Sequence, residues 1–479
     1  MSKQVISFFS LDKEVYEIFN DKNFINEAGK ISNGINYFQA IQNNVFESLR
    51  VKLLGGKKKN ILHSLQVFIR TNGFDHRIKN VVSRLLFKKK NSFRNEAIIF
   101  FCENYVTHIL NDFIKVAETL SKSHPLVFVT TDFRSYKLMK ANASVKISEC
   151  YLIGTNKGNL DQYKVLKKKY EAFFDEFRNA INEKGKYYRE IKKIFFANFK
   201  TLYLFQITFE KFLELKKPKA ILLGSDGFSV SRVLTYTAKN KGISTYVFQH
   251  GILNSYNGYL PLVADKIFVW TQYEREFCRQ NHIDVSRTVV VGAPRFIKTL
   301  PYVSFDDTNK YKILFITSPA SVIEANRQLD VGIDIYNKIN EKKDIEFTIR
   351  PHPYFKNYSN SYLKQKYGKL MATKNLSIDN KDFDISLSEA NIIIFAEIST
   401  TLLESIGSSK CCLLLDSKDD YCGEIVDLYA IKRHTIIDIE EIIAHPQKAK
   451  EHCLYLKRFK DMLSQKDTFK LIESEIDNI

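Results

Sequence analysis

The chain has 479 residues, of which 44% are hydrophobic and 13% aromatic, a composition typical of a folded protein and not of a disordered one. At this length one hydrophobic core is not enough, so we expect two or three domains. There are 72 Lys and Arg against 54 Asp and Glu, and the resulting net charge of +18 favours anionic partners.

No stretch of about eighteen apolar residues occurs, so the sequence predicts no membrane-spanning helix. Charged residues interrupt the amino-terminal segment where a signal peptide has its apolar core. The seven cysteines form no Cys-x-x-Cys pair and no cluster with histidine at metal-binding spacing. We therefore expect a cytoplasmic protein with reduced thiols, no bound metal and no cofactor.

Residues 1–94 are polar and asparagine-rich, and we interpret them as a basic, partly helical extension. Between Arg50 and Arg94 there are thirteen Lys and Arg but one acid, with clusters at Lys57–Lys59 and Lys88–Lys90. Two interpretations stay open: a solvated basic face, or a surface that holds the protein on the anionic inner face of the cytoplasmic membrane. No recognition motif accompanies the charge, so a nucleic-acid partner is not expected.

Residues 95–300 alternate between apolar strand-like runs and amphipathic helices, the pattern of a parallel α/β domain. A βαβ unit begins this domain, and a charged helical insertion near 160–215 interrupts it. The expected elements are a helix over 108–123 and strands over 96–102, 125–131, 220–226, 244–251 and 289–296.

Residues 301–440 repeat this alternation and predict a second domain of the same kind, after which 441–479 form a helical tail. The expected elements are a helix over 329–342 and strands over 311–318, 346–353, 392–397 and 411–416. The fold class is therefore α/β, with two Rossmann-like domains that face a cleft.

The strand that ends near Arg350 runs directly into the turn Arg350-Pro351-His352-Pro353. A turn at the carboxyl end of a parallel strand is where open α/β sheets bind ligands. Arg350 and His352 can donate to phosphate oxygens, while Pro351 and Pro353 stiffen the loop. We predict a nucleotide phosphate site here; the alternative is a loop histidine that caps its own turn.

The following strand leads into Glu397 and then Ser399-Thr400-Thr401, where a helix is expected to begin. Hydroxyl groups and unpaired amides at a helix N-terminus bind anions, so we predict that these residues hold the same phosphate. The alternative is an ordinary helix N-cap, which Ser and Thr favour in any case. Glu397 and Glu404 flank the turn and are predicted to bind the ribose hydroxyls.

Two polar turns follow strands of the first domain. Asp226 lies in Gly224-Ser225-Asp226-Gly227 and is predicted to face the cleft as a general base for an acceptor hydroxyl. The alternative is a tight turn in which Asp226 caps the next helix. His250 holds the equivalent position after the next strand, and is a second candidate for the base or a group that holds the leaving phosphate or the acceptor.

The order and spacing of these motifs resemble the GT-B glycosyltransferases, especially CMP- and CDP-dependent enzymes that build bacterial surface polysaccharides. Bacterial sialyltransferases of that fold are similar in combining an acidic residue and glycine with later His-Pro and Ser-Ser or Ser-Thr pairs. The matching residues are Asp226-Gly227, His352-Pro353 and Ser399-Thr400. The resemblance implies that Asp226 is the base and that the two later motifs bind the CMP phosphate, although Ser225 stands where that family usually has a second acid.

A further stretch, 249–277 continuing to 289–296, resembles capsule-synthesis proteins and teichoic-acid glycerophosphotransferases. In those phosphotransferases the histidine of the His-Gly pair is the proposed base. That resemblance implies His250 in place of Asp226.

Together the resemblances imply a metal-independent glycosyltransferase of capsule or lipopolysaccharide synthesis. It would move a sialic-acid-like nonulosonic acid or Kdo from a CMP-sugar donor to a saccharide or lipid-linked saccharide acceptor. The alternatives are a CDP-polyol phosphotransferase, a UDP-sugar transferase or epimerase, and a non-catalytic basic adaptor bound to a membrane.

Overall fold

The computed structural model describes residues 8–53, 97–142, 145–155, 159–181, 187–253, 256–294, 311–319, 322–340, 345–372, 375–408, 410–416, 431–463 and 467–478. The chain divides into two compact units, Met1–Val291 with Phe469–Ile479, and Gly292–Thr468. Each unit is described by itself below. The basic clusters at Lys57–Lys59 and Lys88–Lys90 lie outside the described residues, so their predicted membrane contact stays a prediction.

The first unit is built on a seven-stranded parallel sheet with the order β3-β2-β1-β4-β5-β6-β7. Its strands are β1 (Ile98–Cys102), β2 (Leu126–Thr130), β3 (Ile147–Leu152), β4 (Ala220–Leu223), β5 (Ser244–Phe248), β6 (Lys266–Val269) and β7 (Thr288–Val290). The central strand β1 reads IIFFC and is buried along its whole length, as expected for a parallel strand covered on both faces. Ile98 pairs with Leu126 on one side and Ala220 on the other.

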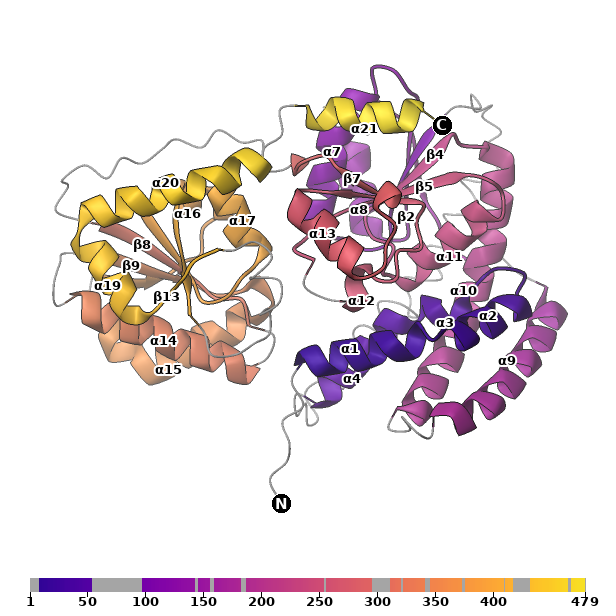
Figure 1. Cartoon of the computed structure of the whole chain (residues 1–479), viewed down its shortest axis with the longest axis horizontal. Helices are drawn as coiled ribbons and strands as arrows, with labels where there is room; N and C mark the ends of the chain where they lie inside the picture. Colours follow the sequence, from indigo (N-terminus) through magenta and orange to yellow (C-terminus); the bar gives the residue numbers. More distant parts are fainter. Residues whose placement is uncertain are drawn as a thin grey trace. The chain divides into compact units, whose positions relative to one another are not determined.

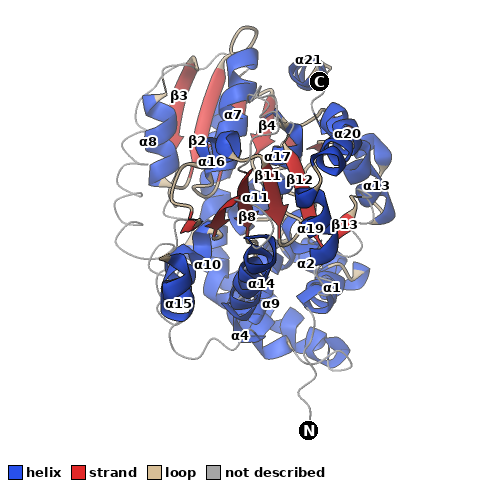
Figure 2. Cartoon of the chain, turned by 90° about the vertical axis from the view of Figure 1, so that its left-hand side faces the viewer, coloured by secondary structure: helices blue, strands red, loops and turns tan. Residues whose placement is uncertain are grey.

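Helices of this unit cover both faces of the sheet (Figure 1). Consecutive residues of a strand point to opposite faces. Accordingly, Phe100 packs on Phe113 of one helix, with ring centroids 5.1 Å apart, whereas Phe101 packs on Phe209 of another at 5.7 Å. The helices are α7 (Thr107–Leu120), α8 (Phe133–Ala141), α9 (Leu160–Ile181), α10 (Tyr188–Lys216), α11 (Ser229–Lys239), α12 (Tyr256–Tyr259), α13 (Gln272–Gln280) and the 3-10 turn η1 (Val285–Arg287). Helix α8 lies beside the edge strand β3 (Figure 2).

The amino-terminal helices also belong to this first unit. They are α1 (Phe8–Phe19), α2 (Lys22–Ile31), α3 (Tyr37–Ala40) and α4 (Gln42–Leu53). Phe38 packs against Phe177 of α9 with ring centroids 5.2 Å apart, and Tyr37 against Phe199 of α10 at 5.1 Å. The α9–α10 pair is the predicted helical insertion, and buried aromatic side chains join it to the amino-terminal helices.

The second unit holds a six-stranded parallel sheet with the order β10-β9-β8-β11-β12-β13. Its strands are β8 (Tyr311–Ile316), β9 (Ile345–Arg350), β10 (Leu376–Ile378), β11 (Ile392–Phe395), β12 (Cys411–Leu415) and β13 (Arg433–His434). Its helices are α14 (Val322–Asn340), α15 (Lys356–Met371), α16 (Phe383–Glu389), α17 (Thr400–Gly407), α19 (Ile436–Ala444), α20 (Pro446–Leu463) and the 3-10 turn η3 (Pro353–Phe355). Helices α14 and α15 lie along one face of this sheet (Figure 1). The predicted α/β class with two Rossmann-like sheets is confirmed.

The carboxyl-terminal helix α21 (Thr468–Asp477) returns to the first unit. Ile472 and Ile476 are fully buried in the core of that unit, beneath the sheet face that also carries Phe100 and Phe128. The chain therefore leaves the first unit after β7 and rejoins it at α21.

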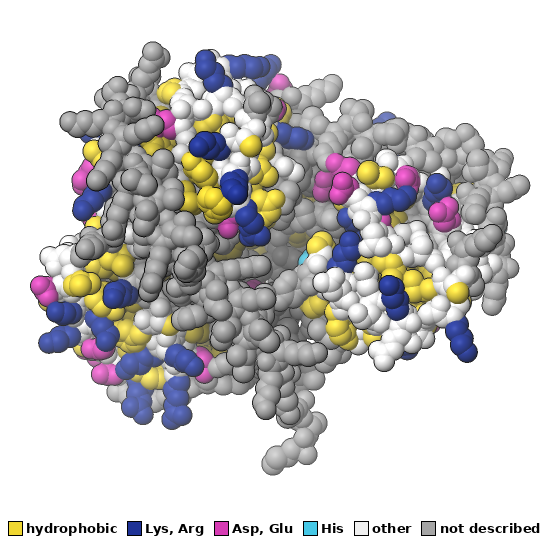
Figure 3. Space-filling view, turned by 180° about the vertical axis from the view of Figure 1, so that it is seen from behind, with side chains coloured by type: hydrophobic (Ala, Val, Ile, Leu, Met, Phe, Trp, Pro, Cys, Tyr) yellow, Lys and Arg dark blue, Asp and Glu magenta, His cyan; other side chains and the backbone are white. Residues whose placement is uncertain are grey.

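Within the described residues no helix is long and apolar enough to cross a membrane. On the face drawn in Figure 3, the described Lys and Arg side chains are interspersed with acidic and apolar ones.

Candidate functional site

The second sheet has a topological switch point between β8 and β11. From β8 the chain continues to β9 on one side, whereas β11 lies on the other side of β8. Connections that leave two adjacent strands in opposite directions open a crevice at the carboxyl ends, and ligands of open α/β sheets bind there. Thr317 follows β8, His352 follows β9 and Glu397 follows β11 at this edge. The sequence prediction of polar residues at one sheet edge is thus met in the second unit.

The loop after β9 is fastened to the end of β8. The backbone amide of His352 donates to Thr317 Oγ1 at 3.1 Å, and the amide of Thr317 donates to the Arg350 carbonyl at 3.1 Å. The amide of Phe355 closes a turn on the His352 carbonyl at 2.9 Å. Pro353 begins the 3-10 turn η3 and is exposed, while the His352 side chain is half-buried. This loop holds His352 at the switch point, as a phosphate ligand would require.

Arg350 makes contacts that the sequence does not predict. Its Nη1 donates to the carboxylate of Asp379, to the Lys381 carbonyl at 3.0 Å and to Ser386 Oγ at 3.3 Å. Burial of Asp379 raises its pKa, but hydrogen bonds from Ser386, the Lys381 amide and Arg350 hold that pKa below its usual range. These contacts favour a role for Arg350 in bracing the edge beside β10. Its predicted contact with phosphate stays a prediction.

Helix α17 begins at the carboxyl edge of β11, with Ser399 in the N-cap position. In the described part of the chain, the Ser399 side chain makes no capping hydrogen bond, and its Oγ lies 2.7 Å from Thr401 Oγ1 instead. The first backbone bond of the helix runs from the Leu402 amide to the Ser399 carbonyl at 3.0 Å. The amides of the first turn and the positive end of the helix dipole are suited to an anion. Ser399 thus holds the N-cap position without a side-chain capping bond, and its predicted contact with phosphate stays a prediction.

Glu397 lies two residues before this helix and is 7% exposed. Its Oε1 has no hydrogen bond within the described residues, and the Arg327 guanidinium is 3.8 Å away. Burial, a hydrogen bond with the Glu324 carboxyl and the charge of Glu324 raise the Glu397 pKa to about 10, against smaller opposing effects of Arg327 and Gln328. These surroundings favour the protonated form of Glu397. A neutral carboxyl does not repel a phosphate and can donate a hydrogen bond to it.

Sequence reasoning missed the partners of Glu397. Glu324, Arg327 and Gln328 lie on the first turns of α14, the helix that follows β8. Gln328 Oε1 also accepts a hydrogen bond from the Ser318 amide at 2.8 Å. They are spaced three and four residues apart, which places them on one face of the helix. Polar residues at this spacing just after a strand could have indicated that they belong to the site.

Glu404 lies on α17 and is half-buried. Its backbone carbonyl accepts hydrogen bonds from the amide and the hydroxyl of Ser408, at 3.0 and 2.9 Å. Its predicted bond to ribose, like those predicted for Thr400 and Thr401 to phosphate, stays a prediction.

In the first unit Asp226, predicted to face the cleft, is 1% exposed. Its Oδ2 accepts hydrogen bonds from the amides of Val263 and Ala264 at 2.8 and 3.0 Å. Burial raises its pKa, while the nearby Arg232 guanidinium and these amides lower it. At the next residue, Gly227, a Cβ atom would lie 2.3 Å from the Gly258 carbonyl oxygen. The Asp-Gly pair therefore joins two loops of the fold, and the role of Asp226 as a base stays a prediction.

Arg232 is fully buried beside Asp226 and serves the same loops. Its guanidinium donates to the carbonyls of Asp226, Gln39 and Leu260, at 2.8, 2.6 and 3.1 Å. These bonds connect α11 to the amino-terminal helices and to the segment before β6. A charged side chain this deeply buried needs such a complete set of partners.

His250 follows β5 and is half-buried. Its ring stacks on Tyr259, with centroids 4.9 Å apart, and the Tyr259 hydroxyl oxygen accepts from the Gly251 amide at 2.8 Å. The preceding Gln249 is 1% exposed, donates to Glu274 Oε1 at 3.0 Å and accepts from the Trp270 amide at 2.9 Å. The backbone on both sides of His250 is thus fixed, and this residue is less buried than Asp226. This geometry suits a base better than that of Asp226.

Glu103 is a further edge residue that sequence reasoning missed. It follows β1, which borders β4 at the switch point of the first sheet. Its Oε2 accepts hydrogen bonds from the Ser231 amide at 2.8 Å and the Ser231 hydroxyl at 3.1 Å, at the start of α11. Burial raises the pKa of Glu103 to about 7, although the bonds from Ser231 lower it. Its position immediately after an apolar strand could have identified Glu103 as a residue at the sheet edge.

No protein-family model matches the sequence, and no curated protein sequence matches it. Solved structures do resemble the fold. A glycosyltransferase from Rickettsia africae is 11% identical with a TM-score of 0.51, over 81% of this chain and 99% of that one. The UDP-GlcNAc 2-epimerase of Neisseria meningitidis bound to UDP-GlcNAc is 12% identical, also with a TM-score of 0.51, over 80% and 100%.

Anabaena HepE in complex with UDP and glucose gives the same TM-score of 0.51 at 10% identity, over 80% of this chain and 100% of that one. At these identities the likeness concerns the fold alone. Two parallel α/β sheets in one chain, a returning carboxyl-terminal helix and these neighbours show that the chain has the GT-B fold.

Proposed function

We propose that the protein is a glycosyltransferase that binds a nucleotide-sugar donor at the switch point of the second sheet. The observation that carries this is the start of α17, where the Ser399 hydroxyl contacts Thr401 and makes no capping hydrogen bond to the first-turn amides. Two residues earlier, the buried Oε1 of Glu397 has no hydrogen bond within the described residues. Together they offer donors and a neutral acid where a phosphate is expected.

We further propose a UDP-sugar as the donor. The neighbouring structures with the same fold contain UDP-GlcNAc or UDP with glucose, which supports uridine nucleotides. The CMP-sugar donor predicted from the motifs His352-Pro353 and Ser399-Thr400 has no such support and becomes the second candidate. The nonulosonic acid or Kdo assigned to that donor, the saccharide or lipid-linked acceptor and the role in surface polysaccharide synthesis stay predictions.

In the proposed reaction the bond between the sugar C1 and the donor phosphate breaks, and a bond forms between C1 and an acceptor hydroxyl oxygen. The hydroxyl proton passes to His250, and the nucleotide leaves with the bonding electrons as an anion. The first turn of α17 and His352 stabilise the negative charge that develops on the leaving phosphate.

A CDP-polyol phosphotransferase is the other chemistry that a specific observation favours. His250 stands in a rigid His-Gly turn, with Gly251 held by Tyr259, as a phosphotransferase base would. That reaction cleaves between the two phosphates and releases CMP. The product nucleotide therefore separates the two activities.

The deciding experiment is a thermal-shift titration of the full chain with UDP, UMP, CDP, CMP and GDP, because binding to the native state raises apparent stability. We expect the largest shift with UDP. Ser399→Ala should reduce the shift, whereas Ser361→Ala, an exposed serine on α15, should leave it unchanged. Preference for CMP would restore the CMP-sugar donor, preference for CDP would favour the phosphotransferase, and no shift with any nucleotide would favour the adaptor.

A further inference from the structure

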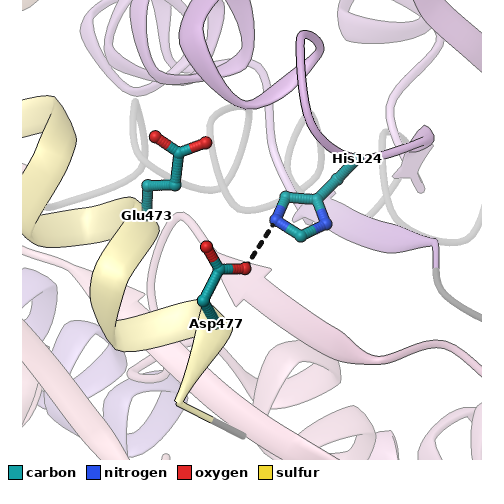
Figure 4. Close-up of side chains that lie close together, drawn as sticks. All are labelled: His124, Glu473 and Asp477. Atoms are coloured by element: carbon teal, nitrogen blue, oxygen red, sulfur yellow. Dashed lines mark ion pairs between the residues drawn. The ribbon is translucent and has the colours of Figure 1, made fainter.

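We propose that His124, Glu473 and Asp477 form a binding site for a divalent transition-metal ion, with Zn²⁺ as the favoured occupant. His124 lies in the loop before β2, and the two acids lie one helical turn apart on α21 (Figure 4). All three belong to the first unit. Some 349 positions separate His124 from Glu473, so sequence spacing, which predicted no metal, could not reveal this group.

The three side chains lie close together. One ligand atom from each residue lies within 4.8 Å of the other two, and His124 Nε2 is 3.0 Å from Asp477 Oδ1. The His124 side chain is 11% exposed. Its Nε2 atom is buried and makes no well-formed hydrogen bond within the described residues. A buried imidazole nitrogen that faces carboxylate oxygen without a proper hydrogen bond is suited to a metal ion between them.

The donor set selects the class of ion. Imidazole nitrogen favours Zn²⁺ and its neighbours in the first transition row, and two carboxylates supply the negative charge that a divalent ion needs. Bonds of about 2.0–2.2 Å to a tetrahedral ion place the ligand atoms about 3.4 Å apart. Small rotations of Glu473 and Asp477 bring the observed spacing into that range, because both project from the same face of α21.

Two neighbouring groups already contact these carboxylates. The Ser123 hydroxyl donates to Glu473 Oε1, and Lys219 Nζ lies 3.5 Å from Asp477 Oδ1. Each carboxylate retains a second oxygen, so these contacts and an ion can be accommodated together. The two acids Glu473 and Asp477 outnumber the one nearby lysine, Lys219, and their negative charge attracts a cation.

The position of the site indicates a structural role. His124 precedes β2, at the amino edge of the first sheet, whereas His250 follows β5 at the carboxyl edge. Helix α21 is already held by Ile472 and Ile476 in the core and by Lys266, whose Nζ is 2.6 Å from Glu475. A metal ion would add a link between α21 and the loop before β2, where the chain rejoins the first unit. Its effect should therefore fall on stability and not on the chemical step.

The test is calorimetric titration of metal-free full-length protein with ZnCl₂, paired with Co²⁺ absorption spectra. We expect one ion per chain, with affinity reduced at least tenfold by Asp477→Asn and by His124→Gln, since losing a ligand should cost no less than the ~10–100-fold typical of an outer partner. Asp477 is half exposed, so its variant should fold even if His124→Gln does not. Zn²⁺ should also raise the melting temperature of the parent protein but not of Asp477→Asn.

Two controls address adventitious binding by other groups. Glu475→Gln alters the same helix outside the cluster, and His445→Gln removes an exposed histidine of the second unit. Both should bind zinc as the parent does. No zinc binding by the parent, zinc binding that survives both Asp477→Asn and His124→Gln, or equal losses in the two controls would each overturn the site.

Discussion

Asp226 in the first unit and Glu397 in the second are buried carboxyls that follow a strand next to a switch point. They differ in their neighbours. Asp226 has two backbone amides on one oxygen and Arg232 beside it, whereas Glu397 has Arg327 at 3.8 Å and a second carboxyl, Glu324, as a hydrogen-bonding partner. A cation and amides stabilise the ionised acid, and a like charge favours the neutral one. Burial raises the pKa of both acids, but Asp226 is tied to two backbone amides, whereas a second carboxyl raises the pKa of Glu397 further.

The largest effect is expected at His250. Because Asp226 is tied into the fold, His250 is the favoured base of the first unit. His250→Asn should lower turnover by about 100- to 10,000-fold, because the acceptor proton loses its receiver. Release of nucleotide from the best-binding donor measures this. His282→Asn, an exposed histidine of the same unit, is the matched control. Unchanged turnover in folded His250→Asn would remove His250 from the mechanism.

Asp226→Ala should destabilise the protein by about 3–5 kcal/mol, because it leaves Arg232 buried without its nearby acid. Urea unfolding followed by circular dichroism measures the loss. Asp284→Ala, at an exposed turn of the same unit, should cost about 1 kcal/mol or less.

Asp226→Asn sharpens the same comparison, since it keeps the shape of the side chain. We expect turnover per folded molecule to stay close to that of the parent. A loss as large as that of His250→Asn would instead make Asp226 the base.

His352→Ala should weaken nucleotide binding by about 1.5–3 kcal/mol, the usual cost of losing a hydrogen bond to a charged group. Calorimetric titration with the preferred nucleotide measures it. His445→Ala changes an exposed histidine in the same unit and should bind normally. Normal affinity in folded His352→Ala would contradict the phosphate assignment.

The last prediction concerns the proton on Glu397. Its pKa rises from an ordinary 4.5 to about 10. Between these values the native state holds a proton that the unfolded chain has lost, so the contribution of Glu397 to stability falls as pH rises through this window. Gln does not titrate, so Glu397→Gln does not lose this stability as pH rises. Its melting temperature relative to the parent should therefore increase from about pH 5 to about pH 9, by about 2–4 °C for each kcal/mol gained.

Glu451→Gln, an exposed acid of the same unit, serves as the control and should show no such trend. A difference between Glu397→Gln and the parent that is flat over this pH range would mean that Glu397 is ionised.

Much of the fold could be predicted because buried parallel strands are continuous apolar runs, such as IIFFC in β1 and CCLLL in β12. Strands without that signature were missed. β3 has a mixed burial pattern at the sheet edge, and β10 and β13 are only three and two residues long. Such short or half-exposed segments bury little apolar surface, so their sequences carry no recognisable hydrophobic pattern.

The sequence by itself determined which residues stand at the ends of strands. His250, His352 and Ser399 each follow an apolar run, and parallel strands bring their carboxyl ends to one edge of their sheet. Only the tertiary structure decided what surrounds each side chain. Arg350 meets Asp379, Glu397 meets Glu324, and His124 meets Asp477 across the fold. Charge state and hydrogen bonding depend on these long-range neighbours, because burial and nearby charges set the free energy of an ionised group, and neither is encoded in local pattern.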